Sequence, residues 1–125
     1  MSASAMTPTD PRPGYGYRVN TTDGVNTTDA VGTTAYEAAG ELLRALAAPV
    51  RIAIVTELGA GPRCVHELVE AVGAPQPLVS QHLRVLRGAG IVRGERRGRE
   101  IAYSLTDEHI GHIVADAITH AREGR

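Results

Sequence analysis

The strongest constraint on the fold is a pair of short amphipathic helices joined by a tight turn. Apolar residues recur at three- and four-residue steps over about residues 64–72 and again over about 76–87, which predicts two helices that each bury one face. Gly73-Ala74-Pro75 separates the two patterns, and Gly88-Ala89-Gly90 ends the second. Two helices joined by a short turn that contains glycine are typical of a helix-turn-helix.

A β-hairpin is predicted directly after these helices. Residues 91–96 and 100–105 form two short runs, and the second alternates apolar and polar residues, as a half-buried strand does. Arg97, Gly98 and Arg99 lie at the predicted tip, where a tight turn favours glycine. A helix-turn-helix followed by such a wing predicts a winged helix-turn-helix, a fold that is mainly α with a small β-hairpin.

Helical patterns flank this motif on both sides. Thr34 is predicted to cap a first helix, and Pro49 starts a second helix that a glycine-rich turn ends after Leu58. The last helix is predicted from about Asp107 to Ala121, with Thr106 as its N-cap. Because Phe and Trp are absent, the core must consist of leucine, isoleucine, valine and alanine.

Residues 1–33 differ from the rest of the chain. They are rich in Thr, Gly, Pro, Asp and Asn, and they contain a tandem repeat, Val19–Asp23 and Val25–Asp29. Such a segment cannot bury enough apolar surface to offset its ordering entropy, so we predict a disordered tail. A ligand-binding arm is the alternative, but the tail has neither His nor Cys. The predicted folded domain, residues 34–125, is small and gains from dimerisation.

The composition excludes several classes of protein. The 125 residues carry a net charge of −1, and the single cysteine rules out an intrachain disulfide or a zinc site of several thiolates. There is no signal-peptide pattern, and no stretch approaches the ~18 apolar residues of a membrane helix, so we expect a soluble cytoplasmic protein without a membrane partner. The chain has no nucleophile elbow, glycine-rich phosphate loop or HExxH motif, and we expect no enzymatic activity.

Arginines gather in the second predicted helix and the hairpin. Residues 80–100 contain six arginines and two glutamates, a local charge of +4. The helix is predicted to place four polar side chains on one exposed stripe: Gln76, Ser80, Gln81 and Arg84. Such side chains read base edges or bind phosphate, and the hairpin adds three arginines for a flanking backbone or minor groove: Arg96, Arg97 and Arg99. A solvated charged surface is the alternative for each feature alone, but together they favour DNA binding.

Two motifs resemble the ArsR/SmtB family of bacterial metal-sensing repressors. The family's LxxLAxPxR opening is matched by residues 43–51, LRALAAPVR, and its recognition helix, VSxHLxxLxxAGLV, by residues 78–92, LVSQHLRVLRGAGIV. The resemblance covers about residues 38–123 and implies a homodimer of winged-helix protomers that binds a palindromic operator. It also implies that three side chains read bases: Gln76, Ser80 and Gln81. His82 lies in the same helix, but its angle favours packing toward the core.

Histidines near both ends of the last helix indicate a metal site shared between two chains. His109 and His120 lie within roughly 20° on one helical face but about 16 Å apart along the axis, so one ion cannot contact both. Two such helices packed antiparallel place His109 beside His120 of the partner subunit, and Asp107 near the partner's Glu123. Two imidazoles and two carboxylates suit tetrahedral zinc, while the same ligands also accept cobalt and leave nickel open.

The ligand spacing is also similar to the interfacial zinc site of the SmtB branch of the family. Its pattern Asp-x-His, ten residues, His-x-x-Glu is matched by Asp107, His109, His120 and Glu123. The resemblance thus implies zinc as the effector, with two ions per dimer. The alternative is a polar face on a structural helix, since His112 and Asp116 share the stripe as further ligands or as groups that orient the ligands.

The resemblance implies a mechanism in which the metal-free dimer blocks transcription and zinc releases it from the operator. In the SmtB branch a ligand histidine bonds a carbonyl at the end of the recognition helix, which here implies a relay from His120 to Gly90 and so to Leu86. Two alternatives remain open. The chain could sense nickel, cobalt or a non-metal signal, or it could be a repressor that binds DNA more tightly with metal. Cys64 has no second cysteine, and we predict a small buried hydrophobe.

Overall fold

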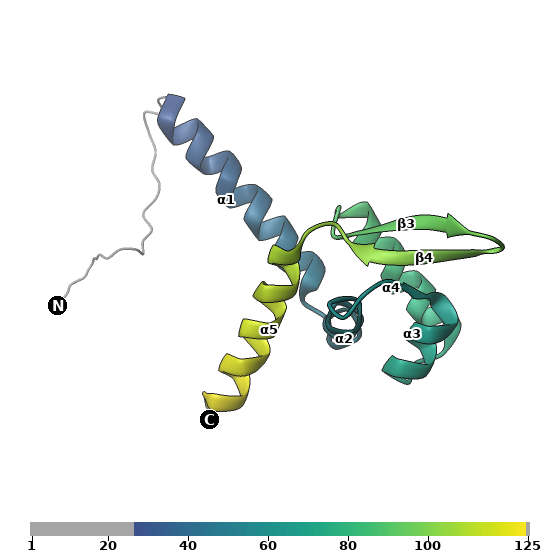
Figure 1. Cartoon of the computed structure of the whole chain (residues 1–125). Coiled ribbons are helices and arrows are strands. Elements are labelled where there is room, and N and C mark those ends of the chain that lie inside the picture. Colours follow the sequence, from purple (N-terminus) through teal and green to yellow (C-terminus); the bar gives the residue numbers. More distant parts are fainter. Residues whose placement is uncertain (1–26, 125) are drawn as a thin grey trace. The chain divides into compact units, whose positions relative to one another are not determined.

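The computed structural model describes residues 27–124, with side chains from residue 34 onward. In this range the chain forms the helices α1 (Thr27–Leu46), α2 (Pro49–Leu58), α3 (Val65–Val72), α4 (Gln76–Gly88) and α5 (Glu108–Glu123), and the strands β2 (Arg63–Cys64), β3 (Val92–Arg97) and β4 (Glu100–Leu105) (Figure 1). The chain divides into a unit that ends at Glu37 and a second unit that begins at Ala38, which holds every site described below. None of the helices described here is long and apolar enough to cross a membrane.

The predicted winged helix-turn-helix is confirmed. Gly73 ends α3 in the left-handed conformation, with a φ of 77°, and α4 begins three residues later. The strands form an antiparallel sheet in the order β2-β4-β3, and Arg97 lies opposite Glu100 beside the hairpin tip. The strand β2 was not predicted, because two residues are too few to show an alternating pattern.

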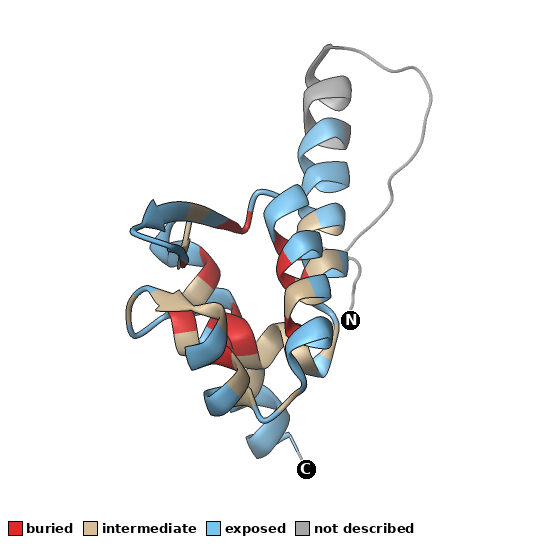
Figure 2. Cartoon of the chain, turned by 90° about the vertical axis from the view of Figure 1, so that its right-hand side faces the viewer, coloured by how far each residue is buried: buried red, intermediate tan, exposed pale blue. Residues whose placement is uncertain are grey.

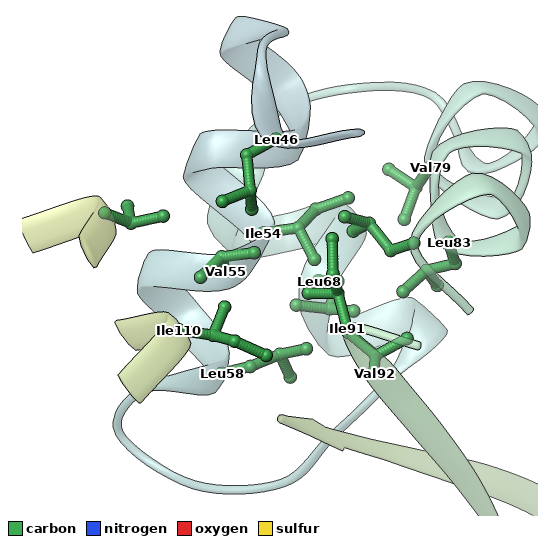
Figure 3. Close-up of a cluster of buried hydrophobic side chains, with 12 residues drawn as sticks. Leu46, Ile54, Val55, Leu58, Leu68, Val79, Leu83, Ile91, Val92 and Ile110 are labelled. Carbon is green, nitrogen blue, oxygen red and sulfur yellow. The ribbon is translucent and has the colours of Figure 1, made fainter. Parts of the chain in front are cut away.

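The core of the second unit is aliphatic, as the composition requires. Helix α2 supplies Ile54, Val55 and Leu58 and contacts α3, α4 and α5. The buried cluster also contains side chains from the other elements (Figure 3): Leu46, Leu68, Val79, Leu83, Leu86, Ile91, Val92, Ile110 and Val114. Figure 2 shows these buried positions on the facing sides of the helices and at the base of the hairpin, while most of the hairpin is exposed. The core therefore fixes α4 and leaves the wing accessible.

Two predicted helix starts are wrong. Helix α1 begins at Thr27 rather than at Thr34, and no proline interrupts the sequence between Pro13 and Pro49 to stop it. Helix α5 has Asp107 as its N-cap, because the Asp107 Oδ1 accepts a hydrogen bond from the His109 N–H at 2.8 Å. Thr106 is not the cap: its hydroxyl donates to the Gly90 carbonyl instead. The remainder of the predicted tail, residues 1–26, lies outside the described residues.

Arg51, the last residue of the LxxLAxPxR match, ties α4 to the end of α1. Its Nε donates to the Ala45 carbonyl at 2.6 Å, and its Nη1 lies 3.1 Å from the Nδ1 of His82. A guanidinium group only donates, so the Nδ1 of His82 is the acceptor of this hydrogen bond. The half-buried His82 thus faces Arg51, in agreement with the prediction that it turns away from the exposed stripe.

Candidate nucleic-acid interface and metal centre

Helix α4 buries one face and exposes the opposite one. Val79, Leu83 and Leu86 are buried at the spacing of a single helical face. Of the side chains predicted to contact DNA, Gln76, Gln81 and Arg84 are exposed, and Ser80 is half-buried. The helix therefore presents polar groups along the side that the core does not cover.

Apolar side chains also belong to this exposed face. Leu78 and Val85 have exposed fractions of 37% and 42%, although α4 is otherwise apolar only toward the core. They share a helical stripe with Gln81, since the three residues stand three and four positions apart. Apolar groups at such positions contact thymine methyl groups in a major groove. The apolar pattern over residues 76–87 did not separate Leu78 and Val85 from the core, because periodicity alone does not distinguish a core residue from one at the edge of the buried face.

The wing carries its arginines on an exposed hairpin. Arg96, Arg97 and Arg99 are exposed, and Gly98 takes the tip with a left-handed φ of 63°. At the base of the hairpin the Arg93 Nη1 donates to the Leu105 carbonyl at 3.4 Å. Among the residues that the structure describes, no carboxylate forms an ion pair with Arg84, Arg96 or Arg99. These guanidinium groups are therefore available to an external anion.

Two of the predicted metal ligands meet at the start of α5. The Asp107 Oδ1 lies 3.4 Å from the Nδ1 of His109, and the two side chains are 56% and 85% exposed. Because the capping bond uses only Oδ1, the second carboxylate oxygen remains open to a further partner. This half of the predicted ligand set is thus assembled within one protomer.

The other two predicted ligands lie at the far end of the same helix. His120 and Glu123 are exposed in the last turn of α5, and His112 and Asp116 are exposed between the two ends. Within the described part of a single protomer, no group of three or more His, Cys, Asp or Glu side chains could hold a metal ion. The four-ligand site therefore stays a prediction that requires a second chain.

The predicted relay is not formed inside one protomer. Between residues 34 and 124 of the same chain, no hydrogen bond joins His120 to Gly90, whose carbonyl accepts from the Thr106 hydroxyl at 2.8 Å. At the end of α4, the Ile91 N–H donates to the Leu86 carbonyl at 2.9 Å. The contact from His120 to Gly90 stays a prediction for the assembled dimer.

Cys64 is not the buried hydrophobe that the sequence predicted. It is half-buried at the start of α3, where the Glu67 Oε1 accepts from its backbone N–H at 2.8 Å. A hydrogen bond to the Glu100 carboxylate, followed by partial burial and by the charges of Glu100 and Glu67, raises the pKa of the Cys64 thiol. Glu100 also lies 3.4 Å from the Nδ1 of His66. The wing therefore disfavours the reactive thiolate form of Cys64.

The substitution Glu100→Gln is expected to make Cys64 more reactive. Removing the carboxylate lowers the thiol pKa, and each unit of that fall gives about tenfold more thiolate at a pH below the pKa. The rate of modification by a chromogenic disulfide reagent at neutral pH should rise about three- to tenfold. Glu108→Gln, at an exposed carboxylate on α5, is the matched control. An equal rate in both variants would contradict the Glu100 contact.

With this geometry in place, the chain can be compared with known proteins. Residues 48–93 match the family described as "Bacterial regulatory protein, arsR family". The chain is 67% identical over 87 residues to the HTH-type transcriptional repressor SmtB of Mycobacterium tuberculosis, an alignment that covers 70% of this chain and 64% of that protein. The chain thus spans less than two thirds of the length of this curated relative.

Solved structures agree with the fold. The transcriptional repressor BigR from Xylella fastidiosa is similar with a TM-score of 0.64 and 36% identity, over 75% of this chain and 95% of that one. The homodimeric winged helix-turn-helix DNA-binding domain of Mb0332 from Mycobacterium bovis gives a TM-score of 0.68 at 24% identity, over 82% of this chain and 93% of that one. The second similarity supports the fold alone.

Proposed function

Because the chain belongs to the arsR family of bacterial regulatory proteins, we propose that it is a zinc-responsive transcriptional repressor. In this proposal the metal-free homodimer binds a palindromic operator in the cytoplasm, and zinc at the paired α5 helices causes release. In this proposal the chain from α1 to α5 forms the DNA-binding and dimerisation domain. The protein needs neither an enzymatic activity nor a membrane partner for this role.

The exposed face of α4 supports the assignment to DNA. Gln76, Ser80 and Gln81 would read base edges in the major groove, and Arg84 would bind guanine or phosphate. The wing arginines Arg96, Arg97 and Arg99 would lie on the flanking backbone or in a minor groove. The observation that carries the proposal is that the arginines of this surface form no ion pair with a described carboxylate, although glutamates are close in sequence.

Exposed apolar side chains on α1 and α5 support a homodimer. Leu43 is 53% exposed and Ile113 is 36% exposed in the single protomer. Burying these side chains against a second chain would remove apolar surface from water. The family resemblance implies that the helices at the two ends of the fold form the dimer interface. A second copy of the chain would therefore cover these side chains.

The ligand set on α5 fits zinc. Asp107 and His109 already lie together, and His120 and Glu123 of the partner subunit would complete two nitrogen and two oxygen ligands. When bound, zinc would supply a rigid cross-link between the two helices. The protein's own part is to present exposed side chains at both ends of α5, so that an antiparallel pair forms two sites per dimer. A sensor of nickel, cobalt or a non-metal signal is the alternative function, since the ligand types alone do not exclude the other metals.

The proposal is tested by titrating a fluorescent duplex of the protein's own promoter region with the full chain. The chelated protein is expected to bind, and zinc should weaken binding by about 5- to 150-fold, the range of a coupling free energy of 1–3 kcal/mol. Parallel titrations with nickel and cobalt test the alternative. Zinc binding by calorimetry should give two ions per dimer. DNA affinity that is the same with zinc and with chelator would contradict the proposal.

A further inference from the structure

Thr106 occupies the joint between the wing and α5. Its Oγ1 donates to the Gly90 carbonyl at 2.8 Å and lies 3.3 Å from the Ile91 carbonyl. Its backbone N–H donates to the same Ile91 carbonyl at 3.0 Å. Thr106 is therefore bonded through both its side chain and its backbone to the turn that follows α4.

That turn closes the recognition helix. Gly90 has a φ of 76°, a conformation that favours glycine, and its N–H donates to the Arg87 carbonyl at 3.0 Å. The next N–H, of Ile91, donates to the buried Leu86 at 2.9 Å. A shift of the Gly90 carbonyl thus changes the last turn of α4, which carries the exposed Arg87.

The other neighbour of Thr106 is a proposed metal ligand. Asp107 follows it directly, caps α5 through a 2.8 Å bond to the His109 N–H, and lies 3.4 Å from the ring of His109. Any reorientation of the Asp107 carboxylate reaches Thr106 through a single peptide unit. One peptide unit and one side-chain hydrogen bond therefore connect the candidate ligand Asp107 to the Gly90 carbonyl at the end of α4.

We propose that Thr106 is a positioning residue that couples the start of α5 to the end of α4 within the same protomer. The inference rests on the proposed function, and it assigns the coupling to a bond that differs from the His120 contact implied by the family resemblance. The backbone bonds of Gly90 and Ile91 hold the end of α4 in place without zinc. The Thr106 hydroxyl transmits a reorientation of Asp107 to the Gly90 carbonyl, and so to the end of α4. Since the exposed Thr106 is outside the core, its hydroxyl can be removed without opening a cavity.

The test compares Thr106→Val, which removes the hydroxyl and keeps the shape, with Thr106→Ser, which keeps the hydroxyl. Thr56→Val is the matched control, because the exposed Thr56 also donates its hydroxyl to a backbone carbonyl, that of Ile52 at 2.8 Å. For each protein, zinc stoichiometry and promoter-duplex affinity are measured with zinc and with chelator. The Thr106→Val variant should bind zinc and, without zinc, bind DNA within about twofold of wild type. Its zinc-driven loss of affinity should be at least fivefold smaller, while the other two variants behave like wild type.

A readout without DNA completes the experiment. Zinc should change the hydrogen-exchange rate of the Ile91 amide in wild type and leave it nearly unchanged in Thr106→Val. Zinc-driven release that is equal in Thr106→Val and wild type would overturn this inference and leave the proposed function intact. A Thr106→Val variant that no longer binds DNA without zinc would also overturn it, because Thr106 would then serve only to place α4. Wild-type protein whose DNA affinity ignores zinc would overturn the proposed function itself, and this inference with it.

Discussion

The substitution His120→Ala is expected to leave promoter binding intact and to abolish its release by zinc. His120 is exposed in the last turn of α5, outside α4 and the hairpin proposed to contact DNA, so chelated protein should bind with wild-type affinity. Removing one of four proposed ligands should reduce a zinc effect of about 5- to 150-fold to less than about threefold. Fluorescence titrations with zinc and with chelator measure both quantities.

His112→Ala is the control for this substitution. His112 is exposed on the same helix but lies outside the proposed set of four ligands. It should keep both the zinc stoichiometry and most of the release, whereas His120→Ala should lose both. Full zinc-driven release in the His120→Ala variant would contradict the ligand assignment. Full loss of zinc-driven release in the His112→Ala variant would instead assign His112 as a ligand.

Removing Arg84 is expected to weaken DNA binding about 5- to 150-fold, which corresponds to the 1–3 kcal/mol of a specific arginine contact. Arg84 is exposed on α4 and has no ion pair among the described residues, so its loss should not disturb the fold. Affinities for the promoter duplex and for an unrelated duplex, measured over a range of salt concentrations, separate base reading from phosphate binding. Arg97→Ala in the wing should instead reduce the salt slope by about one and weaken both duplexes alike.

The control for these two variants is Arg63→Ala. The Arg63 Nη1 already donates to the Pro62 carbonyl at 3.0 Å, and the residue lies outside α4 and the hairpin tip. Its loss should change the affinity less than twofold. An Arg84→Ala variant that also binds the promoter as wild type does would remove α4 from the proposed interface.

Much of the fold was predictable because its signals are local. The spacing of Val79, Leu83 and Leu86 predicts the buried face of α4, and the alternating residues of β4 predict the second strand of the wing. The N-cap of α5 was misplaced by one residue, because Thr106 and Asp107 are both good caps and only the tertiary contact with Gly90 removes Thr106 from that role.

Contacts between distant segments were beyond the sequence pattern. The bond between Arg51 and His82 joins residues 31 positions apart, and the bond between Cys64 and Glu100 depends on β2 pairing with β4. A site that requires two chains is also not complete within either chain alone. The four candidate ligands on α5 were predicted from spacing and resemblance, and their meeting across two protomers stays a prediction for the dimer.

The pairing of β2 with β4 allows the wing tip of a winged helix-turn-helix protein to change independently of the rest of the fold. Because β2 pairs with β4 only at Tyr103 and Ala102, the base of the wing is held on both sides, whereas the tip around Gly98 is a two-stranded ribbon. Changes in the length or sequence of the tip therefore leave both the core and α4 unaltered. Under the proposed function, preference for the sequence that flanks an operator would therefore evolve separately from the reading of bases by α4, and a redesigned tip would retarget the protein without changes to that helix.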